Sequence, residues 1–246
     1  MSRLIVLSGP SCVGKGPLFK ALQKFYPDLA SRLHYLVCYD SRAPRPGERE
    51  GVDFYFRTRE FIENLRGEKD YLVTEYRGDM LAVNFGEIRK FLKEKDVFFE
   101  GNPVVGRAIL DFCKQHGMEH SSMFLTPLSM DEISFLKSPE RSINLADFVT
   151  DVMRRKLLRR TQKQKTILSA KDLENIEVRA SCAFSEMKLA HNFDYIIPNH
   201  DGEDSENWDA FYYPIADAGK TLLCLAAILS GKDNSYCEKW PKDLIS

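Results

Sequence analysis

Short apolar runs alternate along the chain with stretches in which apolar residues recur every three or four positions. The runs predict strands at residues 4–7, 33–39, 70–76, 79–84, 96–99, 122–126 and 193–199. The periodic stretches predict helices at residues 18–26, 58–66, 85–95, 104–116, 130–137, 172–192 and 215–229. Because strands and helices alternate over most of the chain, the pattern favours the α/β class with a parallel sheet.

A glycine-bounded loop joins the first predicted strand to the first predicted helix. It reads Gly9-Pro10-Ser11-Cys12-Val13-Gly14-Lys15-Gly16. In such a loop the backbone N–H groups point inward, the helix N-terminus adds a positive dipole, and the lysine reaches the outer phosphates. The G-x-x-x-x-G-K spacing therefore predicts a polyphosphate site, with a plain connecting turn as the alternative. Gly16 stands where a serine or threonine hydroxyl usually helps to hold Mg²⁺, so that metal contact is missing.

Two arginines mark a second candidate site. Arg42 and Arg45 bracket the Ala43-Pro44 step in a stretch rich in proline and glycine. Guanidinium groups on a rigid turn are suited to bidentate binding of a phosphate. The alternative interpretation is a solvated charged loop.

Residues 42–56 follow the pattern Arg-x-Pro-Arg-x-Gly-Glu-x-x-Gly-x-Asp-aromatic-x-Phe. This pattern resembles the monophosphate-binding signature of guanylate kinases, and together with the glycine loop it makes residues 3–230 similar to that family. The resemblance implies an α/β P-loop NTPase three-layer fold with a parallel sheet core, a small β-rich monophosphate-binding subdomain and a helical lid. The implied parts are a core (1–32, 85–137 and 172–230), an acceptor-binding subdomain (about 33–84), an extended lid (about 138–171) and a C-terminal tail (231–246).

The resemblance also implies a reaction, in which the γ-phosphate of ATP is moved to GMP or a related phosphorylated acceptor with the help of Mg²⁺. Lys15 and the loop would hold the donor phosphates, and Arg42 and Arg45 the acceptor phosphate. The arginines expected to close over the transferred group are Arg159, Arg160 and Arg179. Asn199, at the end of the last predicted strand, would lie near the adenine. Glu100 ends a buried strand, which is where a ligand of Mg²⁺-bound water belongs.

The pocket that would read the base departs from the family pattern. Its residues are Cys38, Phe54, Leu81, Val83 and Asn102, with Glu75 as the nearest candidate for a guanine contact. Polar groups of the family are replaced here by apolar or weakly polar ones, whereas the phosphate-binding frame is kept. This predicts weak preference for GMP. It also leaves open a second function, a guanylate-kinase-like module that binds a ligand or a protein without turnover.

Composition and charge limit the partners and the cellular compartment that we expect. A formal net charge of −1 argues against a dedicated nucleic-acid or membrane binder, and no apolar segment is long enough to span a bilayer. The chain starts with no secretory leader, so we expect a cytoplasmic protein whose six scattered cysteines are reduced. Loop amides could lower the pKa of the Cys12 thiol, but the favoured interpretation of Cys12 is a small residue that fills the loop. Residues 201–208 are expected to form an acidic surface loop, and the oligomeric state is left open.

Overall fold

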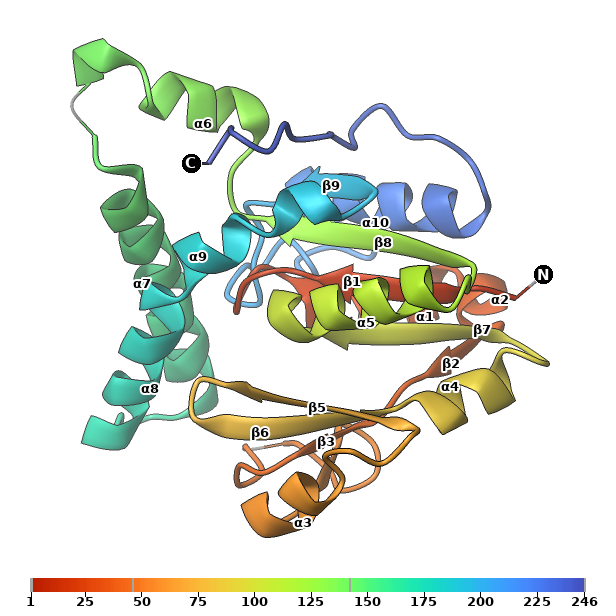
Figure 1. Ribbon diagram of the computed structural model, residues 1–246. Helices are drawn as coiled ribbons and strands as arrows, with labels where there is room; N and C mark the ends of the chain where they lie inside the picture. The colour runs from red at the N-terminus through yellow and green to blue at the C-terminus, as the bar shows by residue number, and fades with distance from the viewer. Residues whose placement is uncertain (1, 46, 142, 246) are drawn as a thin grey trace. The chain divides into compact units, whose positions relative to one another are not determined.

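The computed structural model describes residues 2–45, 47–141 and 143–245, and in these residues it contains two β-sheets (Figure 1). The larger sheet has five strands in the order β2-β7-β1-β8-β9. The strands are β1 (Leu4–Ser8), β2 (Leu33–Tyr35), β7 (Asp96–Gly101), β8 (His120–Thr126) and β9 (Tyr195–Pro198). β2 runs parallel to β7, and β8 parallel to β9. The predicted α/β class with a parallel sheet core is confirmed.

Contacts within the chain divide it into two compact units. The first comprises Met1–Val6, Arg32–Phe99 and Val104–Ser121, and the second Leu7–Ser31, Glu100–Pro103 and Ser122–Ser246. The predicted division into core, acceptor subdomain and lid stays a prediction. Pro46, in the predicted arginine loop, lies outside the described residues.

The first unit contains a four-stranded sheet in the order β4-β3-β6-β5. Its strands are β3 (Cys38–Asp40), β4 (Phe54–Phe56), β5 (Tyr71–Tyr76) and β6 (Asp79–Asn84). Helix α3 (Arg59–Asn64) covers one face by packing Ile62 against Met80 and Ala82 of β6 (Figure 1). The hydroxyl of Thr58 accepts the N–H of Phe61 and so caps this helix. The unit also contains α4 (Phe85–Phe91) and most of α5 (Pro103–Gln115).

The single strand predicted at residues 33–39 is wrong, because the structure has two short strands there in two different sheets. β2 pairs with β7, and the N–H of Leu36 still donates to the carbonyl of Phe98 at 2.8 Å. Two residues later, β3 pairs with β4 and β6 instead. The apolar character continues through the change of sheet, so the sequence pattern carries no sign of it.

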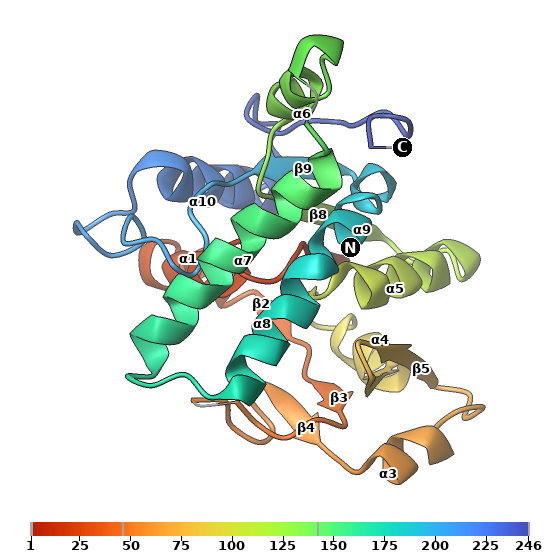
Figure 2. The same cartoon turned by 90° about the vertical axis from the view of Figure 1, so that its left-hand side faces the viewer.

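Helices make up most of the second unit. They are α1 (Lys15–Phe25), α2 (Pro27–Ala30), α6 (Met130–Leu136), α7 (Leu145–Gln164), α8 (Ala170–Ser181), α9 (Ala183–Met187) and α10 (Ala216–Leu229), with 3-10 turns at Pro139–Arg141 and Ala190–Asn192. α7 and α8 lie side by side as a helical pair (Figure 2). The continuous helix predicted at 172–192 is wrong. The hydroxyls of Ser181 and Ser185 donate to carbonyls three residues earlier, and such bonds compete with the helical ladder.

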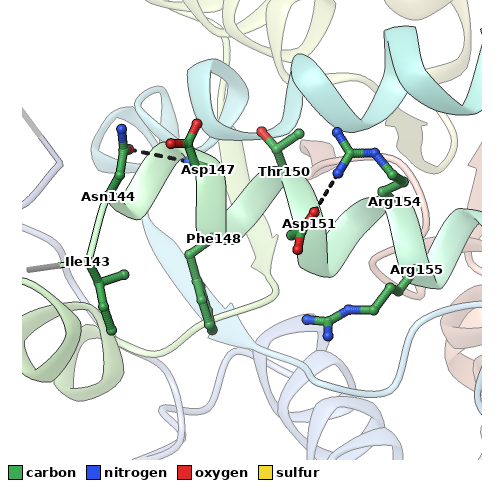
Figure 3. A pocket seen from close by; sticks show the side chains of 8 residues that line it. All are labelled: Ile143, Asn144, Asp147, Phe148, Thr150, Asp151, Arg154 and Arg155. Atoms are coloured by element: carbon green, nitrogen blue, oxygen red, sulfur yellow. Dashed lines mark hydrogen bonds and ion pairs between the residues drawn. The ribbon is translucent and has the colours of Figure 1, made fainter. Parts of the chain in front are cut away.

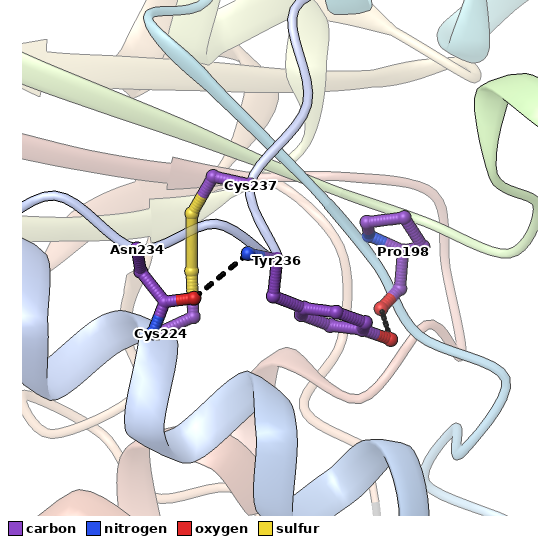
Figure 4. Close-up of a disulfide and its surroundings, with 5 residues drawn as sticks. All are labelled: Pro198, Cys224, Asn234, Tyr236 and Cys237. Atoms are coloured by element: carbon purple, nitrogen blue, oxygen red, sulfur yellow. Dashed lines mark hydrogen bonds between the residues drawn. A yellow bond between two sulfur atoms is a disulfide. The ribbon is translucent and has the colours of Figure 1, made fainter.

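The C-terminal tail is folded onto β9 (Figure 4). Glu238 forms an antiparallel bridge with Ile196, and the hydroxyl of Tyr236 donates to the carbonyl of Pro198 at 2.7 Å. Cys237 forms a disulfide with Cys224 of α10, so the expectation of six reduced cysteines is wrong for this pair. None of the described helices combines the length and the apolarity needed to cross a membrane.

Candidate active site

The glycine loop is folded around its own lysine. Lys15 is 8% exposed, and its Nζ donates to the carbonyls of Gly9 and Pro10 at 2.8 Å each. Gly14 has φ 100°, a left-handed conformation that favours glycine. Lys15 is the first residue of α1, so the N–H groups at the helix start belong to the loop. The loop thus has the parts of a phosphate cradle.

The negative charges of three carboxylates act on Lys15. Burial lowers the pKa of Lys15, while Glu203, Glu100 and Glu186 act in the opposite direction. Glu100, near the end of β7, is therefore part of the same charge cluster. Glu186 on α9 is 2% exposed, and the sequence analysis assigned it no role. Its position within the predicted helix at 172–192 gave no indication of a functional role.

The segment that follows β9 is packed against the glycine loop. Asn199 is fully buried, and its Nδ2 donates to the carbonyls of Val13 and Asp201 at 2.8 Å each. A Cβ built on Gly202 would lie 2.2 Å from the carbonyl oxygen of Cys12, so the two backbones are in close contact. The indole N–H of Trp208 donates to the carbonyls of Asp201 and Gly202. The expectation of a surface loop at 201–208 is wrong in its first half. Asn199 acts here as a brace of the loop.

Glu203 extends from this segment into the cradle. Its Oε2 accepts the N–H of Gly14 at 3.1 Å. Burial acts to raise the pKa of Glu203, but Lys15, Arg160 and the hydrogen bonds from backbone amides outweigh it and hold the pKa below its usual range. The side chain is therefore an ionised carboxylate at neutral pH. The role of Glu203 was not predicted from the sequence, because an acidic residue in a polar segment is typical of a solvent-exposed loop.

The three predicted closing arginines have different surroundings. Arg179 of α8 donates from Nε to the hydroxyl of Ser11 at 3.2 Å, and the positive charge of Arg160 acts on Glu203. Arg159 instead pairs with Asp204, at 2.9 Å from Nε and 2.8 Å from Nη2. The structure thus brings Arg160 and Arg179 to the glycine loop and leaves Arg159 held by a buried carboxylate.

The thiol of Cys12 is not activated. It is 1% exposed, and burial raises its pKa, with Glu203 adding to the effect. The idea that loop amides lower this pKa is wrong. Cys12 is a small buried residue of the loop.

An open groove of about 570 Å³ lies along the start of α7 (Figure 3). It is lined by Ile143, Asn144, Asp147, Phe148, Thr150, Asp151, Arg154 and Arg155. Arg154 is bound to Asp151 and to Glu177 of α8, so it serves as a link within the helical pair. None of the residues predicted for the active site lines this groove.

In the first unit, Glu48 holds both predicted acceptor arginines. Its carboxylate forms two hydrogen bonds with the Arg42 guanidinium, at 2.6 and 2.8 Å, and accepts the backbone N–H of Arg45 at 2.7 Å. Asp40 adds a third contact to Arg42 at 3.1 Å. Burial acts to raise the pKa of Glu48, but the two arginines lower it below its usual range. Glu48 stands in the signature pattern itself, yet the sequence analysis assigned it no role.

The register of the four-stranded sheet decides which side chains share a face with Arg42. Residues directly opposite each other in neighbouring strands point to the same side. On this basis one face carries Cys38, Asp40, Phe54, Phe56, Leu72, Thr74, Leu81 and Val83. The Arg42 guanidinium lies 5.0 Å from the ring centre of Phe54 and 5.6 Å from that of Phe56, on this same face. The predicted pocket residues Cys38, Phe54, Leu81 and Val83 thus share a face of the sheet with the Arg42 guanidinium.

Glu75 does not belong to this face. It is opposite Met80, on the side covered by α3, and its carboxylate pairs with Arg59 of that helix at 2.9 Å. The placement of Glu75 in the pocket is wrong. The β5 residues on the Arg42 face are Leu72 and Thr74, which the sequence analysis missed. Asn102 directly follows β7 and lies in the second unit.

The donor set fits Mg²⁺ bound through a nucleotide better than Mg²⁺ held by protein alone. The described residues contain no group of three or more His, Cys, Asp or Glu side chains that could hold a metal ion. Mg²⁺ in phosphoryl-transfer sites commonly uses one or two carboxylates, phosphate oxygens and water. Glu100, a carboxylate that acts on the buried Lys15, supplies one such group.

The comparisons with known proteins agree on one family. A sequence model of the guanylate kinase family matches residues 1–133. The chain is 32% identical over 216 residues to a guanylate kinase of Synechococcus sp. (strain JA-3-3Ab), covering 86% of this chain and 82% of the relative. It is 34% identical over 198 residues to a guanylate kinase of Bacillus cereus (strain ZK / E33L), covering 80% of each.

A solved structure shares the fold. The crystal structure of guanylate kinase from Anaplasma phagocytophilum aligns with a TM-score of 0.53 at 18% identity, over 94% of this chain and 85% of that chain. At this identity the likeness concerns the fold alone. It agrees with the fold that the resemblance to guanylate kinases implies.

Proposed function

This chain belongs to the guanylate kinase family of nucleoside monophosphate kinases, and on that premise we propose that it transfers the γ-phosphate of ATP to GMP or a closely related phosphorylated acceptor. The observation that carries the proposal is the glycine loop closed around the buried Lys15. The non-catalytic module, the alternative function, is not favoured by the relatives, which are named as kinases.

Phosphoryl transfer depends on positioning and on neutralising charge. Lys15 and the N–H groups of the loop would bind the donor phosphates. Arg160 and Arg179, both at the loop, would neutralise charge that develops on the transferred group. Mg²⁺, when bound, supplies further neutralisation of the phosphate oxygens, and Glu100 would orient its water ligands. No general base is required, because a phosphate acceptor is already anionic.

Arg42 and Arg45 would bind the phosphate of the acceptor. Each charge-assisted hydrogen bond of this kind contributes on the order of 1.5–3 kcal/mol. Glu48 and Asp40 contact the Arg42 guanidinium, so the protein itself fixes the orientation of this group. Preordering of this type lowers the entropy lost on binding.

The acceptor face supports weak selection of the base. Apart from Asp40 and Thr74, its residues are apolar or weakly polar, and Asp40 is already bound to Arg42. Strong discrimination requires polar groups that the wrong ligand leaves unpaired, whereas shape in an apolar pocket gives about 1–3 kcal/mol. We therefore propose GMP as the default acceptor, with other monophosphates accepted. The cytoplasmic setting and the oligomeric state stay open.

The test is a coupled assay of ATP-dependent turnover with GMP, dGMP, AMP, CMP and UMP side by side. We expect turnover of GMP and a kcat/KM advantage over the other monophosphates of less than about a thousandfold, or roughly 4 kcal/mol. Lys15→Met should abolish turnover and leave the folded state intact by circular dichroism. Absence of turnover with every acceptor would refute the kinase proposal, and a larger preference for GMP would refute weak selection.

A further inference from the structure

The glycine loop has an anion of the protein's own, the Glu203 carboxylate, bound to one of its amides. The carboxylate of Glu203 accepts the N–H of Gly14, one of the loop amides that a donor phosphate uses. Lys15 and Arg160, the cations available to that phosphate, are also the main positive charges acting on Glu203. A phosphate and the Glu203 carboxylate would therefore require the same donor and the same charges.

The segment around Glu203 is anchored at several points. Gly202 touches the carbonyl of Cys12, and Trp208 holds the backbone on either side of position 202. The carboxylate of Asp201 accepts the N–H of Ala218 at the start of α10 and the hydroxyl of Ser205. With its backbone fixed, Glu203 acts on the cradle as an intramolecular ligand at high effective concentration.

We propose that Glu203 is an internal competitor of the donor phosphate. Its carboxylate accepts the Gly14 N–H, and binding of a nucleotide phosphate at that amide requires rotation of the Glu203 side chain out of the cradle. Competition by a tethered group lowers the affinity of the cradle for every ligand by a similar factor. Small anions with few contacts, such as pyrophosphate, then fall below useful affinity, whereas a nucleoside triphosphate with additional contacts does not. The proposal rests on the donor role of the glycine loop.

The test is calorimetric titration of the full chain with ADP and, separately, with pyrophosphate, both in the presence of EDTA. Glu203→Gln keeps the shape of the side chain and removes its charge. We expect it to bind ADP and pyrophosphate at least about tenfold more tightly than the natural chain. The matched control is Glu206→Gln, which removes the same charge from the same segment. The Glu206 side chain is 82% exposed and lies 3.9 Å from Lys163, so the affinities should stay within about twofold.

A second variant keeps the charge and shortens the reach. Glu203→Asp lacks one methylene, and on the anchored backbone its carboxylate no longer reaches the Gly14 amide. We expect it to bind ADP more tightly than the natural chain, and it covers the case in which Glu203→Gln does not fold. Equal or weaker ADP binding by the folded variants would overturn the proposal. Absence of ADP binding in the natural chain would overturn the donor site as well, so the two failures are distinguishable.

Discussion

Single positions in the glycine loop decide how the donor is bound. Gly16 is the residue that departs from the usual pattern. A Cβ built on it would have no neighbouring atom within 4 Å, so the missing hydroxyl is not excluded by space. A side chain with a hydroxyl can therefore be introduced at position 16 without disturbing the packing.

We predict that Gly16→Ser strengthens the use of Mg²⁺. The new hydroxyl would stand where P-loop enzymes hold a metal ligand. The Mg²⁺ concentration that gives half-maximal turnover should fall severalfold, and the unfolding temperature should not fall, because serine replaces glycine inside a helix. Gly16→Ala is the matched control, since it adds the Cβ without the hydroxyl. An equal response of both variants would contradict the prediction.

The candidate site residues that could be proposed from the sequence carry local signals. Lys15 follows from the glycine spacing, and Arg42 from a signature that extends over residues 42–56. Glu203 was not predictable, because it meets Gly14 across a separation of 189 residues. Nothing in its neighbourhood distinguishes it from the acids beside it. Its role follows from the close approach of two backbones, which a sequence pattern does not record.

At the scale of elements, the register of the four-stranded sheet decides which side chains share a face with Arg42. The strands at 70–76 and 79–84 were predicted almost to the residue, yet Glu75 was assigned to the wrong side. In a strand, a shift of one residue moves a side chain to the opposite face. Pattern alone cannot settle that shift where both faces of β5 are half-buried.

The face assignment predicts that substitutions at the adjacent positions 74 and 75 differ in their effect on base selectivity. Thr74→Glu introduces a carboxylate on the Arg42 face and should raise the ratio of kcat/KM for GMP over AMP about tenfold, because a matched acceptor of hydrogen bonds is restored. Glu75→Gln should leave that ratio unchanged, since Glu75 pairs with Arg59. A change in the ratio caused by Glu75→Gln alone would show that the face assignment is wrong.

His200 links two helices through their acidic ends. Its Nδ1 contacts Asp217 of α10 at 2.6 Å, and its Nε2 contacts Glu132 of α6 at 2.9 Å. Partial burial acts to lower the pKa of His200, but the two carboxylates outweigh it and raise the pKa above the usual value. The protonated ring is therefore favoured in the folded state. Asp217 also bonds Lys220, which belongs to the same charge group.

Because the folded-state pKa of His200 is raised, its stabilising effect is complete below the unfolded pKa and disappears as pH rises through the folded pKa. We predict that His200→Gln lowers the free energy of unfolding more at about pH 5.5 than at about pH 8.5. Urea denaturation at both pH values measures this. His191→Gln is the control, since that ring bonds the carbonyl of Lys188. A loss that is equal at both pH values would contradict the prediction.

At the scale of the whole molecule, the described part of the C-terminal tail belongs to the folded structure. It pairs with β9 through Glu238, and Trp240 and Ile245 are only 7% and 6% exposed. β9 leads directly into Asn199, which braces the glycine loop. The tail therefore supports the strand that leads into the Asn199 brace of the glycine loop.

The disulfide should contribute measurably to that support. Cys224 and Cys237 are separated by 13 residues, and closing a loop of this size stabilises the folded state by about 3 kcal/mol. We predict that Cys237→Ser, or reduction of the natural chain, lowers the free energy of unfolding by about this amount. Cys182→Ser, at a free and partly exposed cysteine, should have little effect. Unchanged unfolding after reduction would contradict the prediction.

The contact between Gly202 and Cys12 has a consequence for how this protein tolerates genetic change. Loops usually accept substitutions and insertions with little cost. Here any codon change at position 202 that encodes another amino acid adds a Cβ against a backbone carbonyl 2.2 Å away, which no side-chain rotation relieves. The second half of the same loop, with Glu206 and Asp209 exposed, has no such restriction. Inherited variation should therefore be eliminated at position 202 and permitted at positions 206 and 209, within a span of a few residues.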